Sequence, residues 1–326
     1  MEIIKNPNFD FLSKRKIAYL ISAVVILIGL VSIIMHGGLK YHIDFTGGLA
    51  LEVAPYSVSG QTPLTVEQIR EVLRNNGISA EIQELPRTNS FLIKAKPDDM
   101  VLAQMDDVGN AEAGNNAFGD SIINILRTEF PEYTNNEDFI RSSDFVGPRA
   151  GADLRRKAVN AVLISLLFLL VYIWIRFRFT WGFICAFGLL HDTMIALAIL
   201  SLTGKEIGMT VLAGLLTIIG YSINNTIVIF DRFRENLKLY RKDTDAQIIN
   251  RSVNETLNRN IVLSFTTLLA IFALLIFGGS VIHDFAFTLM VGIVAGTFSS
   301  IYIVSGLIFE TMTALSKKRA EKQAKK

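Results

Sequence analysis

The sequence predicts a polytopic α-helical membrane protein with six transmembrane helices and a ferredoxin-like α+β domain between the first two helices. Three observations predict this class. Hydrophobic residues make up 51% of the 326 residues, and the mean hydropathy of +0.40 is high for a soluble domain. Six apolar runs are long enough to cross a bilayer at about 1.5 Å per residue. One polar insertion alternates between strand-like and helix-like patterns.

The first apolar run, residues 17–35, follows a basic cluster of Lys5, Lys14, Arg15 and Lys16. The run resembles a signal sequence, but it is long enough to span the membrane and no Ala-x-Ala cleavage site follows it. We therefore expect a retained first helix within residues 1–36. The basic cluster predicts a cytoplasmic N-terminus, because positive charge is retained on that side.

Residues 37–151 form the polar insertion, whose order strand, helix, strand, strand, helix, strand is that of a ferredoxin-like domain. We expect strands at residues 41–53, 78–85, 90–95 and 138–146, and helices at residues 65–76 and 117–130. Thr65 is the expected N-cap of the first helix and Gly77 its stop, and Pro131 is expected to end the second helix. A turn is expected at residues 86–89 and a loop at residues 94–116.

Five further apolar runs lie within residues 152–311, at residues 158–175, 181–202, 209–230, 261–277 and 285–309. Strong positive charge occurs at the N-terminus, at Arg176 and Arg178, in a loop over residues 231–260 and in the tail over residues 312–326. Six spans place all these segments on one side of the membrane. The sequence thus predicts cytoplasmic termini in a bacterial inner membrane protein, with residues 37–151 in the periplasm or outside the cell.

Polar residues inside the apolar runs are the candidate functional residues, since such groups are costly in hydrocarbon unless they face a partner or a water-filled path. Asp192, beside His191 in the third run, is the one carboxylate well inside a run. Either it is a proton relay or conformational-coupling site, or it forms a helix–helix hydrogen bond together with His191. The fourth run carries the polar residues Ser222, Asn224, Asn225 and Thr226.

Residue spacing adds further expectations for the fourth to sixth helices. Thr217, Tyr221 and Asn225 are four residues apart, so they are expected on one face, where Asn225 hydrogen-bonds but cannot titrate. Arg259, at the start of the fifth run, is either a positive anchor or a charge that approaches that face. The sixth run carries small residues suited to close helix packing, namely Gly292, Gly296, Thr297, Ser299 and Ser300.

Several function classes find no support in the sequence. It contains no zinc-protease motif, no P-loop and no nucleophile elbow, and its four histidines have no metal-ligand spacing. Cys185 is the single cysteine and lies in an apolar run, so we expect a core residue. The formal charge of +2 is too small to indicate nucleic acid. We therefore expect a non-enzymatic protein without metal or cofactor, driven by an ion gradient or by a partner.

A series of different short motifs occurs along the chain, from the first span to the last. Outside the spans they are Asp44, Phe45, Thr46, Gly47, Gly48, Gly147, Pro148, Asp231, Arg232, Arg234, Gly278 and Gly279. Within the spans they are His191, Asp192, Gly220, Tyr221, Ser222, Asn224, Ser299 and Ser300. Together these motifs resemble the SecF members of the SecD/SecF family of protein-export membrane proteins.

The resemblance implies a six-span subunit, half of a transporter bundle of the resistance–nodulation–division type, with SecD as its obligate membrane partner. The pair would use the proton-motive force to help draw preproteins out of the SecYEG channel late in translocation. YajC is a further partner that the resemblance implies. It also implies that the external domain is ferredoxin-like, in agreement with the pattern read from the residues.

The resemblance also assigns roles in the fourth and fifth spans. At the position of Asn225, SecF members usually carry an Asp that takes up a proton during transport, and an Arg matching Arg259 responds to it. Three explanations of Asn225 stay open: the carboxylate of SecD carries the proton alone, Asp192 has taken over, or the residue was introduced to trap one state. His42 replaces the more usual Gly, which affects only the local turn.

Two alternatives belong to other function classes. A self-sufficient exporter of small molecules or lipids, from the same superfamily, would need a substrate cavity between spans and larger external domains. One external domain of modest size argues against it. A structural translocon subunit without its own proton site is motivated by Asn225, because a carboxamide does not titrate.

Overall fold

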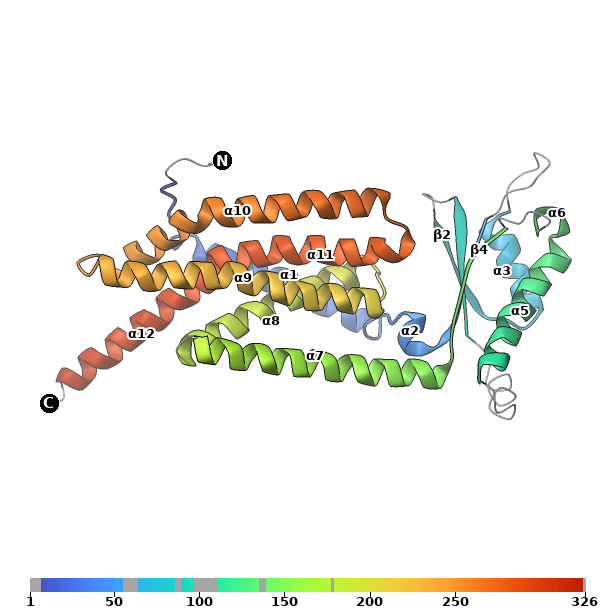
Figure 1. Ribbon diagram of the computed structural model, residues 1–326, viewed down its shortest axis with the longest axis horizontal. Helices are drawn as coiled ribbons and strands as arrows, with labels where there is room; N and C mark the ends of the chain where they lie inside the picture. Colours follow the sequence, from blue (N-terminus) through green and yellow to red (C-terminus); the bar gives the residue numbers. More distant parts are fainter. Residues whose placement is uncertain are drawn as a thin grey trace. The chain divides into compact units, whose positions relative to one another are not determined.

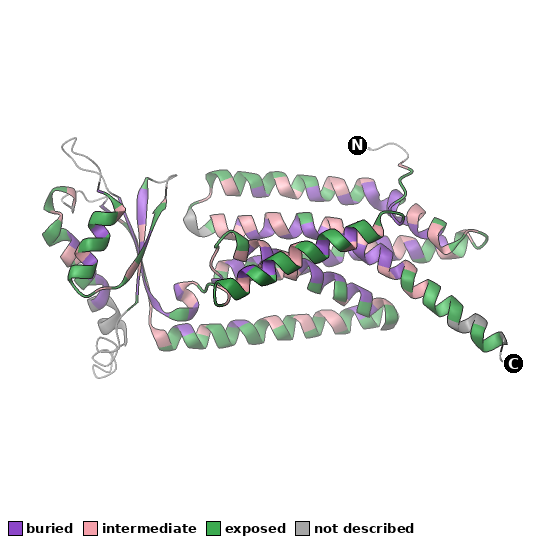
Figure 2. Cartoon of the chain, turned by 180° about the vertical axis from the view of Figure 1, so that it is seen from behind, coloured by how far each residue is buried: buried purple, intermediate pink, exposed green. Residues whose placement is uncertain are grey.

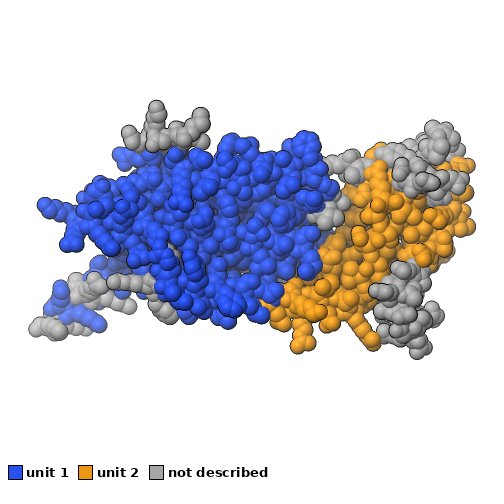
Figure 3. Space-filling model, viewed as in Figure 1, with its two compact units in different colours: residues 1–40, 161–326 blue, residues 41–160 orange. Residues whose placement is uncertain are grey.

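The computed structural model describes residues 7–54, 64–85, 89–96, 111–134, 139–176 and 179–324. Most of the turn expected at residues 86–89, most of the loop expected at residues 94–116, and Arg178 lie outside these described residues. The chain divides into two compact units, one of residues 1–40 and 161–326 and the other of residues 41–160 (Figure 3). Each unit has a hydrophobic core of its own.

The smaller unit is built on a four-stranded antiparallel sheet with strand order β2-β3-β1-β4. Its strands are β1 (Gly48–Val53), β2 (Ala80–Leu85), β3 (Ser90–Ala95) and β4 (Ile140–Val146). Its helices are α2 (Ile43–Thr46), α3 (Val66–Asn75), α5 (Ala111–Glu129) and α6 (Pro131–Thr134). Because α3 follows β1 and α5 follows β3, the expected ferredoxin-like order is confirmed.

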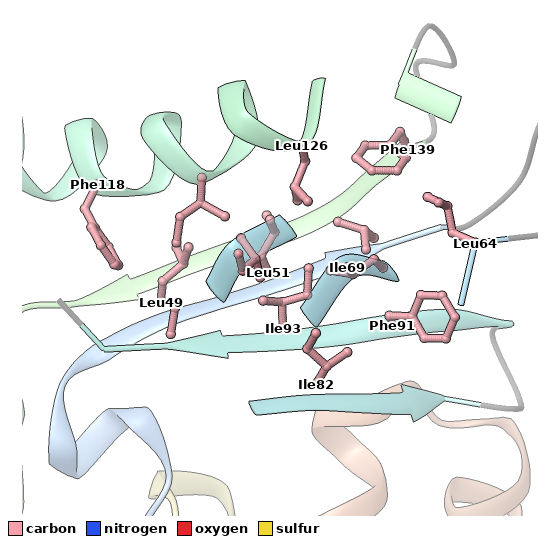
Figure 4. Packing of buried hydrophobic residues seen from close by; sticks show 14 residues of the cluster. Leu49, Leu51, Leu64, Ile69, Ile82, Phe91, Ile93, Phe118, Leu126 and Phe139 are labelled. Atoms are coloured by element: carbon pink, nitrogen blue, oxygen red, sulfur yellow. The ribbon is translucent and has the colours of Figure 1, made fainter. Parts of the chain in front are cut away.

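One face of the sheet carries the core of this unit. Leu49 and Leu51 are alternate residues of β1, so both point to the same face. There they join one buried cluster with Ile69 of α3 and Leu126 of α5, which cover that face (Figure 4). The apolar side chains at alternate positions of β1 therefore form the surface on which α3 and α5 pack.

The start and end of α3 agree with the expected signals. The Thr65 hydroxyl accepts a hydrogen bond from the backbone N–H of Gln68, and the Gln68 side chain accepts one from the Thr65 N–H at 2.9 Å. This reciprocal capping box satisfies two N–H groups that the first turn leaves unpaired. Gly77 follows the helix with a φ of +76°, which glycine adopts without strain.

The strand expected over residues 41–53 is wrong in its first half, because residues 43–46 form the short helix α2. His42 begins α2 by accepting a hydrogen bond from the backbone N–H of Asp44 at 3.4 Å. Gly47, with a φ of +73°, ends it. A local side-chain cap thus overrides the alternating pattern up to Gly48.

The second long helix of this unit is longer than expected. It begins at Ala111, so Gly114, Asn115 and Asn116 of the expected loop are helical. Once the apolar face of α5 is packed on the sheet, each added residue costs little, and the helix extends over weak formers. Pro131 begins α6, because a missing N–H is tolerated at the first helical position.

The larger unit is helical, and α7 crosses the boundary between the two units. Its elements are α1 (Arg15–Met35), α7 (Pro148–Arg176), α8 (Phe179–Leu202), α9 (Met209–Leu239), α10 (Asp245–Phe277), α11 (Ser280–Phe298), the π-helical segment η2 (Ser299–Val304) and α12 (Ser305–Ala324). In the described part of the chain, six helical segments are long and apolar enough to cross a membrane. The expected six-span fold class is confirmed.

The segment expected as a loop over residues 231–260 is helical except between α9 and α10, at residues 240–244. Thr244 begins α10 with a second capping box. The two helices are joined by an ion pair between Arg232 and Glu255 at 2.6 Å. The charged residues of this segment, for which the sequence predicts a loop, are thus helical and are stabilised by ion pairs with the neighbouring helix.

Helix packing is uneven across the larger unit. α9 packs against α8, α10 and α11, and α8 also packs against α1 (Figure 1). By contrast, α7 exposes many of its apolar side chains (Figure 2). Gly278 and Gly279 link α10 to α11, and a Cβ at Gly278 would collide with the carbonyl oxygen of Leu274. Because α9 packs against three helices, it is the central helix of the larger unit.

Candidate functional site

The carboxylate of α8 lies in the interior of the larger unit. Asp192 is 1% exposed and accepts a hydrogen bond through Oδ2 from the hydroxyl of Ser222 on α9. Nδ1 of His191 lies 2.9 Å from its other oxygen, Oδ1. Residues of two helices thus form one buried polar contact, which includes a group able to carry a proton.

A third helix closes this contact. A Cβ at Gly296 of α11 would lie 3.1 Å from Cβ of Ser222 and 3.4 Å from Oδ2 of Asp192. One turn earlier, Ile218 of α9 occupies the space that a Cβ at Gly292 would need. The small-residue face expected in the sixth run therefore lets α9 and α11 approach closely. Asp192 lies where α8, α9 and α11 meet.

A chain of hydroxyl groups joins α9, α10 and α11. The Tyr221 hydroxyl donates to Oγ of Ser264 at 3.2 Å, and Oγ of Ser264 lies 2.7 Å from Oγ1 of Thr297. Thr297 in turn donates to the carbonyl oxygen of Ile293 at 2.7 Å. These bonds fix the positions of the three helices relative to one another along their axes.

Asn225 and Arg259 lie in different surroundings. Asn225 is 1% exposed, and its Nδ2 atom has no hydrogen-bond partner among the described residues. Arg259 is exposed and makes no ion pair with any described acidic residue. The buried residue at this point of α10 is its neighbour Asn260.

The expectation that Thr217, Tyr221 and Asn225 share one face is wrong. Thr217 is exposed, Tyr221 is half-buried and Asn225 is buried. At 3.6 residues per turn, a step of four residues turns about 40° beyond a full circle, so the line winds from the surface into the bundle. The residues that are exposed together on α9 are Ala213, Thr217, Gly220 and Asn224.

The strength of the hydrogen bond between Ser222 and Asp192 depends on the charge of the carboxyl group. Ionised Asp192 accepts a charge-assisted hydrogen bond from Ser222, and such bonds are about twice as strong as neutral ones. Protonation of Asp192 removes the charge and weakens that bond.

Comparison with known proteins identifies the relatives of this chain. A family model described as "Protein export membrane protein SecD/SecF, C-terminal" matches residues 127–314. The protein translocase subunit SecF of Calditerrivibrio nitroreducens is 38% identical over 315 residues, which cover 95% of this chain and 96% of that protein. The SecF of Endomicrobium trichonymphae is 35% identical over 311 residues, covering 95% of this chain and 93% of that protein.

The chain belongs to the SecD/SecF family. A solved structure agrees: the crystal structure of SecDF from Thermus thermophilus is 35% identical, with a TM-score of 0.75 over 94% of this chain. This chain spans only 39% of that SecDF chain. A second structure, SecDF in a super-membrane-facing form, has a TM-score of 0.65 and 34% identity, with 99% of this chain and 41% of that one covered.

The family motifs before and after the smaller unit's sheet meet at one junction. A Cβ at Gly47 would lie 2.7 Å from Cα of Pro148, and a Cβ at Gly151 would lie 2.9 Å from the backbone nitrogen of Gly47. The Gly151 N–H donates to the carbonyl oxygen of Gly147 at 2.8 Å. The first motif also supplies α2 and the start of β1, through Asp44, Phe45, Thr46 and Gly48. These family residues are explained by close backbone packing.

The charged family motif lies at the end of α9. Asp231 accepts a hydrogen bond from Nη2 of Arg176 at 2.7 Å, and Arg234 lies 4.0 Å from the same carboxylate. Arg232 binds Glu255 of α10 at 2.6 Å. This motif therefore joins α9 to α7 and α10.

Sequence reasoning missed the contact of the N-terminal segment with α10. Oδ1 and Nδ2 of Asn254 pair with the backbone N–H and carbonyl oxygen of Phe9, each at 2.9 Å. Asn250 accepts from the Phe11 N–H at 3.1 Å and donates to Asp10 at 2.8 Å. This bond, followed by one from the Ser13 N–H, lowers the pKa of Asp10. The sequence carries one indication of this contact: Asn250 and Asn254 are four residues apart, so on a helix they would lie on one face.

Proposed function

We propose that this chain acts in Sec protein export together with SecD, and that the pair uses the proton-motive force to assist late preprotein translocation through SecYEG. The relatives that match nearly its whole length are protein translocase subunits. The observation that carries the proton coupling is the buried Asp192 carboxylate, held by Ser222 and beside His191. No ATP site is needed if a proton gradient supplies the energy.

In this proposal Asp192 takes up a proton from one side of the membrane and releases it to the other. Protonation weakens the bond to Ser222, and deprotonation restores it. The contact between α8 and α9 then alternates between two packings, which is the two-state element that coupling requires. With both termini cytoplasmic, residues 37–151 would face the periplasm and meet the emerging preprotein.

The need for a membrane partner is supported by the open face of α9. Asn224 is exposed and has no hydrogen-bond partner in the described part of the chain, and a Cβ at Gly220 would meet open space. A carboxamide facing lipid is costly, whereas small residues beside it suit a close helix contact. A relative from Thermus thermophilus, SecDF, contains the matching region as 38% of a longer chain. We assign SecD to this face, and SecYEG and YajC to contacts elsewhere.

The test uses membrane vesicles that contain SecYEG, SecD and this chain, and measures how far a proton gradient stimulates late translocation of a preprotein. Asp192→Asn keeps the shape and the acceptor oxygen but cannot take up a proton. We expect stimulation to fall to the level without a gradient, while Thr266→Val keeps full stimulation, because Thr266 is exposed on α10 and donates only to carbonyl oxygens of its own helix. Full stimulation in the Asp192→Asn variant would reject the proton role of Asp192.

A second candidate function, a structural subunit without its own proton site, is favoured by the uncharged Asn225. It predicts that both Asp192→Asn and Asn225→Asp leave gradient-stimulated export unchanged. A clear gain on Asn225→Asp would reject it. The two candidates therefore separate in the same vesicle assay.

A further inference from the structure

We propose that α9 and α10 bind one buried water molecule between Asn225 and Asn260. Neither side chain titrates, and neither takes part in the Asp192 contact. The proposal therefore stands apart from the proposed function. It rests on the register of the two helices and on the hydrogen-bonding groups that these residues leave unpaired.

The register places the two side chains opposite each other. α9 and α10 run antiparallel and are joined by the hydrogen bond from Tyr221 to Ser264 at 3.2 Å. One turn along α9 towards Asn236 lies Asn225, and one turn back along α10 lies Asn260. An equal step along each helix keeps the two Asn residues level with each other across the antiparallel pair. Asn225 also lies about three full turns from Asn236, which bonds to α10, so the two residues share the side of α9 that faces α10.

A second bond confirms this direction. Further along the pair, Nδ2 of Asn236 donates to Oγ of Ser252 at 3.0 Å. Asn225 and Asn260 therefore lie between two cross-links, and each is 1% exposed. Side chains held in this way cannot turn outward to reach solvent.

The two carboxamides nevertheless lack partners. Nδ2 of Asn225 and both Nδ2 and Oδ1 of Asn260 have no hydrogen-bond partner among the described residues. They do not bond to each other. Buried amide groups without partners are strongly disfavoured, and native proteins satisfy them with protein groups or with ordered water.

The chemistry of the unpaired atoms selects the ligand. A cation would satisfy only the oxygen of Asn260, and an anion would satisfy only the NH₂ groups. Water both donates and accepts, so one molecule can accept from Asn225 and also bond to Asn260. Exchanging O and N within either amide leaves this argument unchanged, because each carboxamide has one of each. A buried water typically makes about three hydrogen bonds, and this pair offers three unpaired atoms: Nδ2 of Asn225, and Nδ2 and Oδ1 of Asn260.

The first test needs no variant. A high-resolution structure of the complete chain in complex with SecD should show one ordered solvent peak within hydrogen-bond distance of both carboxamides. A direct bond between Asn225 and Asn260, or a dry contact between them, would overturn the proposal. Loss of proton coupling in Asp192→Asn does not bear on this result, so the two proposals fail separately.

The second test is a double-mutant cycle followed by thermal unfolding of the same complex. Asn225→Leu and Asn260→Leu should each lower the melting temperature, and the double variant should lose less than the sum, because no unpaired amide then remains. The matched control combines Asn225→Leu with Thr266→Val, an exposed position of α10, and should be additive. An additive result for Asn225 and Asn260 would contradict a shared water. If either variant fails to fold, the solvent peak decides.

Discussion

Two faces of α9 carry similar residues in opposite surroundings. On the inner face, Ser222 and Asn225 are buried, and Ser222 bonds to Asp192 within the same chain. On the outer face, Gly220 and Asn224 are exposed, and Asn224 has no hydrogen-bond partner in the described part of the chain. Asn224 and Asn225 are neighbours in sequence, yet a turn of about 100° separates their environments.

We infer from this difference that the two faces of α9 bind different partners. On the inner face, Ser222 is bonded to Asp192 of the same chain and Asn225 is enclosed by its helices, so both residues affect the folding of this chain. The outer groups gain nothing from this chain, and in hydrocarbon they would remain costly. Substitutions on the inner face should therefore change the isolated chain, whereas those on the outer face should change its assembly.

The largest contrast is expected at two glycines. Gly296→Val would force a side chain against Ser222 and Asp192, and overpacking of this kind typically costs about 1–3 kcal/mol. Gly220→Val points into open space in the chain alone and should leave its melting temperature close to that of the native protein. Thermal unfolding in detergent checks both changes.

Copurification gives the complementary readout for these glycines. Gly220→Val should lose SecD although the chain stays folded, because the added side chain would hold a partner helix away. Retention of SecD by Gly220→Val, or equal melting temperatures for the two variants, would break the comparison between the faces.

A smaller contrast is expected between two hydroxyls. Ser222→Ala removes the donor to Asp192 and should destabilise the chain by about 1–3 kcal/mol, because a buried acceptor loses its partner. Thr217→Val removes a hydroxyl that donates only to the carbonyl oxygen of Ala213 in its own helix, so the change should stay within about 0.5 kcal/mol. Chemical denaturation in the same detergent measures both, and a larger loss for Thr217→Val would reverse the assignment.

The smallest effect is expected outside the spans, at Asp10. Its pKa lies below the ordinary value of 3.8, chiefly because Asn250 donates to the carboxylate. A lowered folded-state pKa means that the stabilisation is complete above the unfolded value and is lost as the pH falls through the folded one. The protection factors of the Phe11 and Leu12 amides, which correct hydrogen exchange for its intrinsic pH dependence, should thus stay constant at neutral and mildly acidic pH and fall only below about pH 4.

The matched variant for this prediction is Asp10→Ala. It removes the acceptor for Asn250, so the protection factor of Phe11 should be lower than in the native chain at neutral pH and should no longer change with acidification. An unchanged acid dependence in Asp10→Ala would assign the effect to another group.

Much of the fold follows from local signals in the sequence. Apolar runs of membrane length locate the six spans, and the capping box at Thr65 fixes the start of α3. The spacing of Gly292 and Gly296 correctly predicts a close helix contact. These features depend on residues near one another in the chain, which is why sequence reasoning finds them.

Other features depend on partners far away in sequence. The helical extensions of α9 and α10 are stabilised by pairs such as Arg232 with Glu255, and neither charge alone predicts a helix. The sequence singles out Asp192, His191 and Ser222 as polar residues of the spans, but it does not predict the contact among them. A four-residue step does not indicate which side of α9 faces the bundle, because that side is set by α8 and α11.

The central claim is that α9 turns its outer face to SecD and its inner face to its own bundle. Cysteine scanning tests it most directly, in a chain whose single cysteine is removed by Cys185→Ala, with thiol cross-linking to SecD in native membranes. We predict adducts from Thr217→Cys and Asn224→Cys, and none from Ser222→Cys or Asn225→Cys. Adducts from the inner positions, or none from the outer ones, would contradict this account.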